Sequence, residues 1–351
     1  MRELWQRPAL DPPQAHGAPL GSGILRSQPE DFVVEEELGF APAGTGQHVL
    51  LRVRKRNANT QWVARELARA CPCRPADVGY AGLKDRHAVA VQWFTVPRSA
   101  RSVQSWTSLR GADYEILEAH PHTRKLPRGA LAANRFEIRI REARVDEAAL
   151  AQRMERIARL GVPNYFGPQR FGREGANLLR IAAPLSDLRP PERGFILSAA
   201  RSLIFNGVLA ERVADGSWAS AEPGDLLNLD GRASFFAVGE LDASLRERCA
   251  RMDIHPTGPM WGRGEPATGG RVGELERRVA AALAPAPELL AAAGLSHERR
   301  SLRVAVRELG WACEAAEVRL RFHLGRGSFA TTVLREIFNV DSREDLAPAD
   351  D

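Results

Sequence analysis

At 351 residues the chain can bury a large core and is long for a single domain, so we expect two domains. Its hydrophobic content of 44% and charged content of 26% are those of a globular protein, and no run approaches the roughly 18 apolar residues of a membrane span. The net charge of +5 permits a polyanion as a partner. The N-terminus lacks the apolar core of a signal peptide, so we expect a cytoplasmic protein.

The first half of the chain is predicted to form strands and two helices. The first 20 residues contain several prolines, and we expect them to be irregular. β-Branched residues and alternating apolar residues predict strands at 31–38, 48–55, 77–81, 88–96, 113–118 and 135–141. Thr60 is predicted to be the N-cap of a helix over 61–70. A second helix, over 145–160, is predicted to stop at Gly161.

From Pro184 the chain changes character, and three prolines at 184, 190 and 191 indicate a domain boundary. The predicted elements that follow are a helix over 195–214, a hairpin over 224–240, a loop over 255–262, helices to about 293, strands at 301–307 and 317–324, and a helix over 328–339. This order predicts an α+β domain, residues 1–184 and 304–340, with residues 185–303 inserted into it. Residues 341–351 are predicted to be a disordered acidic tail.

One charged turn stands between two predicted strands. It lies in the stretch Val78-Gly-Tyr-Ala-Gly-Leu-Lys-Asp-Arg-His-Ala88, where Lys84 and Arg86 flank Asp85. Nearby positive charge keeps such a carboxylate ionised. An ionised carboxylate at the end of a strand is a nucleophile, a base or a salt-bridge partner, and the turn alone favours the salt bridge.

Two other stretches carry residue types that RNA-binding proteins use. Asn164 to Gly172 holds two glycines, one proline and three aromatic residues, which predicts either a packed turn or a loop that holds a flat base. Arg52, Arg54, Lys55 and Arg56 end a predicted strand, where they either contact phosphate or form a solvated edge.

Cysteine and glycine patterns give no reason to expect a metal or a cofactor. Cys71 and Cys73 are one residue apart, and no second pair or nearby histidine cluster completes a zinc site. The Gly-x-Gly at residues 44–46 is followed by no Gly-Lys-Ser/Thr, so it is interpreted as a turn and not as a nucleotide-binding loop.

The segment Gly82-Leu-Lys-Asp-Arg-His-Ala88, followed by Gln92-Trp93, resembles the nucleophile motif of the TruD family of tRNA pseudouridine synthases. Four more stretches match that family in the same order: Pro29-Glu-Asp-Phe-Val-Val-Glu35, Asn164-Tyr-Phe-Gly-Pro-Gln-Arg-Phe-Gly172, Arg201-Ser-Leu-Ile-Phe-Asn206 and Gly327-Ser-Phe-Ala-Thr331. The resemblance runs from about residue 21 to about residue 340.

This resemblance implies a pseudouridine synthase catalytic domain with a mixed, largely antiparallel sheet, interrupted by a smaller α+β TRUD domain. The implied reaction flips a uridine of tRNA out of its stack, cuts its N1–C1′ bond and rejoins the uracil through C5. In the family's bacterial members the uridine is at position thirteen, in the D-arm. One carboxylate suffices as the nucleophile, at C1′ or at C6, and no cofactor is implied. We expect tRNA as the partner, no membrane or DNA partner, and a monomer.

The resemblance also implies roles for single residues. Asp85 matches the nucleophile, and Phe32 and Phe329 match positions that contact the target base. Asn164 matches an amide that hydrogen-bonds in the pocket, and Phe166 matches the aromatic residue next to it.

A cation is expected near the nucleophile. Arg26 stands where a family lysine is expected, which keeps the charge but not the geometry. Whether Arg26 pairs with Asp85 is open at this stage. His87 is either a proton shuttle or a structural donor, and the structural role is favoured.

Two other functions compete with this interpretation. A non-catalytic RNA-binding or chaperone module explains the charge and the aromatic residues, but it gives the turn at Asp85 no purpose. A methyltransferase would need a Gly-rich loop after a first strand and an acidic residue for the cofactor ribose, and neither is present in that context.

Overall fold

The computed structural model describes residues 2–98, 105–232 and 234–342, and its contacts divide the chain into two compact units. The helical unit comprises residues 1–18, 151–305 and 331–337, and the sheet unit comprises residues 19–150, 306–330 and 338–351. The domain boundaries expected from the sequence, at residues 184 and 303, stay a prediction. From residue 343 on, the predicted acidic tail lies outside the described residues.

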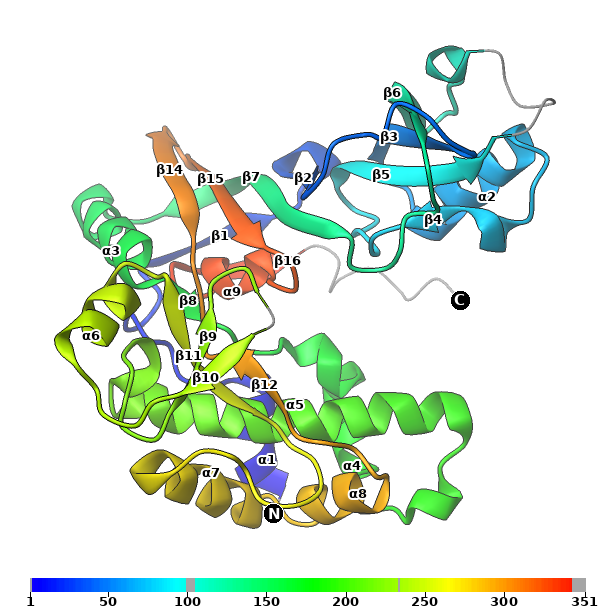
Figure 1. Ribbon diagram of the computed structural model, residues 1–351. Helices are drawn as coiled ribbons and strands as arrows, with labels where there is room; N and C mark the ends of the chain where they lie inside the picture. Colours follow the sequence, from blue (N-terminus) through cyan, green and yellow to red (C-terminus); the bar gives the residue numbers. More distant parts are fainter. Residues whose placement is uncertain (1, 99–104, 233, 343–351) are drawn as a thin grey trace. The chain divides into compact units, whose positions relative to one another are not determined.

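The sheet unit is built on one ten-stranded sheet (Figure 1). Its elements are β1 (Gly21–Leu25), β2 (Phe32–Leu38), β3 (His48–Arg56), β4 (Gly79–Tyr80), β5 (Val89–Pro97), β6 (Tyr114–His122), β7 (Leu131–Arg144), β14 (Arg307–Glu314), β15 (Glu317–Gly325), β16 (Phe338–Ser342) and the helix α2 (Thr60–Ala70). The strand order is β14-β15-β7-β2-β5-β3-β6, with β4 beside β5 and β1 between β7 and β16. The pairs β1–β16 and β2–β5 are parallel and the others antiparallel, so the predicted mixed, largely antiparallel sheet is confirmed.

Strand β3 shows how the alternation of side chains builds this sheet. Leu51 and Val53 point to one face, where they are fully buried in a cluster that includes Val63 and Leu67 of α2. Burying each of these side chains contributes about 1.5–3 kcal/mol. Because successive strand residues point to opposite faces, Lys55 shares this buried face.

The other face of β3 carries arginines that are paired with carboxylates. Arg52 pairs with Glu35 and Glu118 of the neighbouring strands. Arg54 lies 3.6 Å from Glu115, and Arg56 lies 2.6 Å from Glu30. For these three arginines the structure therefore favours a solvated surface of ion pairs over contact with phosphate. Lys55 lies on the opposite face of the strand.

The helical unit is organised around α5 (Pro190–Ala214), against which α1, α4, α7 and α8 pack (Figure 1). Its other helices are α1 (Arg2–Leu10), α4 (Ala176–Leu179), α6 (Ala243–Ala250), α7 (Gly270–Ala282) and α8 (Ala286–Ala292), together with α3 (Glu147–Leu160) and α9 (Ala330–Leu334), which begin shortly before the segments of this unit do. By length and composition α5 could cross a membrane, but 61% of its most apolar window is buried. Packing in the core accounts for that composition.

Two small sheets complete the helical unit. The four-stranded sheet has the order β10-β9-β11-β12, formed by β9 (Leu226–Leu229), β10 (Phe235–Ala237), β11 (Ile254–Met260) and β12 (Glu298–Ser301). A two-stranded sheet joins β8 (Val162–Pro163) to β13 (Arg303–Val304). Successive residues of β12 point in opposite directions, which gives Arg299 and Arg300 different partners.

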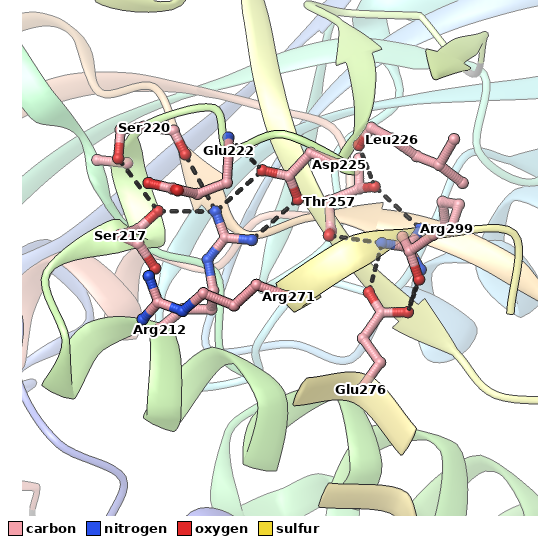
Figure 2. A network of polar contacts seen from close by, with 12 residues as sticks. Arg212, Ser217, Ser220, Glu222, Asp225, Leu226, Thr257, Arg271, Glu276 and Arg299 are labelled. Carbon is pink, nitrogen blue, oxygen red and sulfur yellow. Dashed lines mark hydrogen bonds and ion pairs between the residues drawn. The ribbon is translucent and has the colours of Figure 1, made fainter. Parts of the chain in front are cut away.

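Buried ion pairs tie this sheet to the helices (Figure 2). The Arg212 guanidinium donates to both carboxylate oxygens of Asp225 at 2.9 and 3.1 Å, and also to the backbone carbonyls of Ser217 and Ser220. Arg299 donates to both carboxylate oxygens of Glu276, at 3.0 and 2.8 Å.

The Arg212–Asp225 pair yields a stability prediction. Its side chains are 2% and 0% exposed, so Asp225→Ala leaves a buried guanidinium without its carboxylate and is expected to lower the free energy of unfolding by about 3–5 kcal/mol. Arg271→Ala is the control, because Arg271 pairs with Asp215 while 72% exposed. Its expected loss is below about 1 kcal/mol. Urea denaturation measures both values, and equal losses would contradict the prediction.

Several predicted elements are wrong in part, and the strand expected at 301–307 is divided among β12, β13 and the start of β14. Residues 2–10, expected to be irregular, form α1, because Trp5 and Ala9 are buried in the core cluster around α5. The helix predicted at 195 begins at Pro190, because proline is accepted in the first turn of a helix. Residues expected to form a loop at 255–262 mostly form β11, whose prolines hide the strand pattern. The final helix ends at Leu334, and β16 follows it in parallel with β1.

Thr60 is the first residue of α2, and the N-cap is Asn59, so the predicted cap is also wrong. The Thr60 side chain is buried, and its hydroxyl group donates to Gln92 Oε1 at 3.0 Å. This bond links the start of α2 to strand β5.

Candidate active site

Residues 82–88, here called the Asp85 loop, join β4 to β5. Two buried polar side chains hold its first half. Gln92 Nε2 donates to the Gly82 carbonyl at 2.6 Å, and the Lys84 backbone N–H donates to Thr60 Oγ1 at 3.0 Å. Since Thr60 also donates to Gln92, both supports belong to one hydrogen-bonded chain. These hydrogen bonds hold the backbone of the loop in place at Gly82 and Lys84.

Side chains alternate along this loop. Leu83 is 63% exposed and the Asp85 side chain is 54% exposed, whereas Lys84 between them turns inward. Lys84 Nζ lies 2.6 Å from Glu36 Oε1, and Glu36 is buried in β2. The loop thus directs the carboxylate of Asp85 outward while Lys84 anchors the loop to β2, because successive residues of an extended backbone point in opposite directions.

The cation at the Asp85 carboxylate is Arg26, which follows β1. Arg26 Nη2 donates to Asp85 Oδ2 at 2.5 Å. Its guanidinium also lies over the Phe32 ring, 4.3 Å from the centroid. Arg26 has a backbone φ of 58°, in the left-handed region that a residue with a side chain rarely adopts. The structure therefore brings together three predicted site residues and gives Arg26 a direct contact with Asp85.

A second cation reaches the same residue from inside the unit. Lys55 is fully buried, and its Nζ donates to the backbone carbonyls of Asp85 and Ala58, both at 2.7 Å. Burial lowers the pKa of Lys55 to about 8. Sequence reasoning missed this residue because it grouped Lys55 with the exposed arginines. Its place on the buried face of β3 was the available signal.

The two predicted aromatic contacts of the sheet unit differ in exposure. Phe32 is 3% exposed and packs edge to face against Phe136, with ring centroids 6.0 Å apart. Phe329, beyond β15, is 37% exposed. Of these two rings, that of Phe329 is the more exposed to solvent, whereas that of Phe32 supports the guanidinium of Arg26.

Asn164 and Phe166 belong to the helical unit, where Arg300 of β12 contacts both. Asn164 Oδ1 accepts from Arg300 Nη2 at 2.5 Å, and Asn164 Nδ2 donates to the Ser301 carbonyl at 2.8 Å. The Arg300 guanidinium lies 4.3 Å from the centroid of the Phe166 ring. Burial and the positive charge of Arg170 lower the pKa of Arg300 to about 10.

The loop that carries Phe166 is also held by Asn206 of α5. The Phe166 backbone N–H donates to Asn206 Oδ1 at 2.9 Å, and Asn206 Nδ2 donates to the Phe166 carbonyl at 3.0 Å. Asn206 ends one of the stretches that resemble the family, so the sequence contained a signal for it. Arg300 lies outside those stretches and was not predicted.

Known proteins resemble this chain along nearly its whole length. The family described as tRNA pseudouridine synthase D (TruD) matches residues 16–183 and 181–337. The tRNA pseudouridine synthase D of Nitrosococcus oceani is 47% identical over 326 residues, which cover 91% of each chain. That of Stutzerimonas stutzeri is 44% identical over 340 residues, which cover 95% of this chain and 98% of the relative.

A solved structure is also similar to this fold. The crystal structure described as the putative tRNA pseudouridine synthase D from Methanosarcina mazei has a TM-score of 0.69, covers 95% of this chain and 97% of its own, and is 22% identical. That likeness confirms the predicted fold class. With a family match along both parts of the chain and relatives above 40% identity, the chain belongs to the TruD family of tRNA pseudouridine synthases.

Proposed function

We propose that this isomerase converts the uridine at position thirteen of tRNA, in the D-arm, to pseudouridine, with Asp85 as its nucleophile. Membership of the TruD family supports the reaction class. The observation that carries the assignment of the nucleophile is the geometry of Asp85: a half-exposed carboxylate on a fixed loop, bonded to Arg26. An exposed carboxylate on a fixed loop can serve as a nucleophile.

The chemistry needs few groups, because substrate and product are isomers. The uridine leaves its stack, and the Asp85 carboxylate attacks either C1′ of the ribose or C6 of the ring. The N1–C1′ bond breaks, the uracil turns, and a bond forms between C5 and C1′. The bond between Asp85 and the substrate also breaks, and its electron pair returns to the carboxylate. C5 then loses its proton and N1 gains one, so atoms and electrons balance without a co-reactant.

Four other residues are proposed to handle the base. The exposed ring of Phe329 is the proposed stacking surface, since base–aromatic stacking contributes about 1–3 kcal/mol per base. Phe32 is proposed to contact the base, as the family resemblance implies, and its ring also supports the guanidinium of Arg26. Asn164 and Phe166 are proposed to contact the uracil, with Arg300 holding the Asn164 amide in place.

The proposal extends to the surroundings of the enzyme. We expect a cytoplasmic monomer with tRNA as its nucleic-acid partner, and neither DNA nor a membrane as a partner. A structural role for His87 stays a prediction.

The test is to map pseudouridine in tRNA transcripts incubated with the pure protein and no added cofactor. Carbodiimide treatment marks pseudouridine, and primer extension then stops beside it. One new stop at a D-arm uridine is the expected result. RNA binding without a stop in any transcript would favour the non-catalytic RNA-binding module.

A further inference from the structure

Lys55 is a fully buried cation in the strand that supports the Asp85 loop. A buried ammonium group is costly unless its N–H groups are satisfied. The two acceptors at 2.7 Å are main-chain carbonyls, those of Ala58 and Asp85. Lys55 is therefore bonded to the backbone of the proposed nucleophile, while Arg26 is bonded to its carboxylate.

Three buried side chains contact the main chain of this loop at different points. Gln92 bonds Gly82, Thr60 bonds Lys84, and Lys55 bonds the carbonyl of Asp85 itself. The first two are neutral hydrogen bonds, whereas that of Lys55 is charge-assisted when the ammonium is protonated and about twice as strong. Of the three supports, that of Lys55 is the nearest to the reacting carboxylate.

We propose that Lys55 is a positioning residue of the reaction: its ammonium group holds the Asp85 carbonyl and so fixes the carboxylate against Arg26, in reach of the substrate. This inference rests on the proposed role of Asp85. A misplacement of about 1 Å at a reacting group costs on the order of 100-fold in rate, so a support at this carbonyl affects turnover more than substrate binding.

The charge of Lys55 makes the inference measurable. Asp85 of the loop and Glu36 of β2 favour its protonated form, while burial and Lys84 disfavour it, and the balance lowers its pKa to about 8. The ammonium is present below that pH and is lost above it. Turnover is therefore expected to fall as the pH rises through about 8.

The effect of Lys55 on stability has the opposite sign. The pKa of Lys55 is about 8 in the folded state and 10.5 in its ordinary state, so between these values the unfolded chain holds the extra proton. The contribution of Lys55 to stability therefore rises with pH in this window. A loss of turnover between these two pH values is therefore not explained by unfolding that the deprotonation of Lys55 causes.

The experiment compares the wild type with Lys55→Met and Thr60→Val, measuring kcat, KM and tRNA affinity from about pH 6.5 to about pH 9. Lys55→Met keeps the length of the side chain and removes its charge. It is expected to lower kcat about 10- to 100-fold, to change tRNA affinity less than about threefold and to abolish the alkaline fall. Thr60→Val loosens the same loop without a titrating group, so its kcat falls while the alkaline fall remains.

Three results would overturn the inference: a wild-type profile that is flat through pH 8, a Lys55→Met variant with wild-type kcat, or a Thr60→Val variant without the alkaline fall. The wild-type profile and Thr60→Val decide the question even if Lys55→Met fails to fold. Asp85→Asn is measured alongside. If it stays active, the proposed nucleophile is wrong; if it is inactive while Lys55→Met is fully active, only the inference about Lys55 is wrong.

Discussion

Asp85→Asn is expected to abolish pseudouridine formation, a loss on the order of 10⁴-fold or more, while tRNA affinity changes less than about threefold. The amide keeps the shape of the carboxylate but lacks the negative charge that a nucleophile needs. Binding is preserved because the supports of the loop contact its backbone and Lys84 and do not involve the Asp85 side chain. Removing a negative charge also does not weaken attraction to a polyanion.

Asp77→Asn is the matched control for this experiment. Asp77 is also a partly exposed carboxylate paired with an arginine, Arg74 at 3.0 Å, and it lies eight positions before Asp85 in the same unit. If Asp85 were an ordinary salt-bridge partner, the two variants would behave alike. Single-turnover assays with equal, saturating enzyme separate the two interpretations, and measurable product from Asp85→Asn would remove Asp85 from the role of nucleophile.

Sequence patterns correctly predicted those strands and helices in which apolar residues recur with the period of the strand or helix. The alternation of Phe136, Ile138 and Ile140 predicted β7, and the amphipathic pattern at 145–160 predicted α3, which ends before Gly161. Elements that depend on a distant partner were missed. α1 is helical because Trp5 and Ala9 are buried in the core around α5, and no pattern within ten residues encodes that contact.

In the candidate site, too, local features could be predicted from the sequence, whereas contacts between distant residues could not. The sequence indicated that Asp85 lies in a turn with cations beside it, but its neighbour Lys84 is used to bind Glu36. The cation bonded to the carboxylate is Arg26, which lies 59 positions earlier in the sequence. Only the folding of the sheet unit brings these two side chains together. Lys55 could have been identified from the sequence, because strict alternation in β3 places it with Leu51 and Val53 on the buried face.

Arg26→Met is expected to lower kcat about 10- to 100-fold with little change in KM. The variant removes a hydrogen bond to a charged group, a contribution of about 1.5–3 kcal/mol, and each 1.36 kcal/mol is tenfold in rate. Since Asp85 is half exposed, solvent screening places the expected loss toward the lower end of that range. Arg26→Lys keeps the charge but loses the planar contact with the Phe32 ring, so its expected loss is below about tenfold.

The salt dependence of tRNA binding distinguishes this role from phosphate binding. An arginine that neutralises a phosphate contributes about one unit to the slope of log Kd against log salt concentration. The Arg26 side chain is only 10% exposed, and its guanidinium is bonded to Asp85 and stacked on Phe32. We therefore expect the slope to be the same in the wild type and in Arg26→Met. A slope reduced by about one, with kcat unchanged, would make Arg26 a phosphate ligand and leave Asp85 without its proposed activating cation.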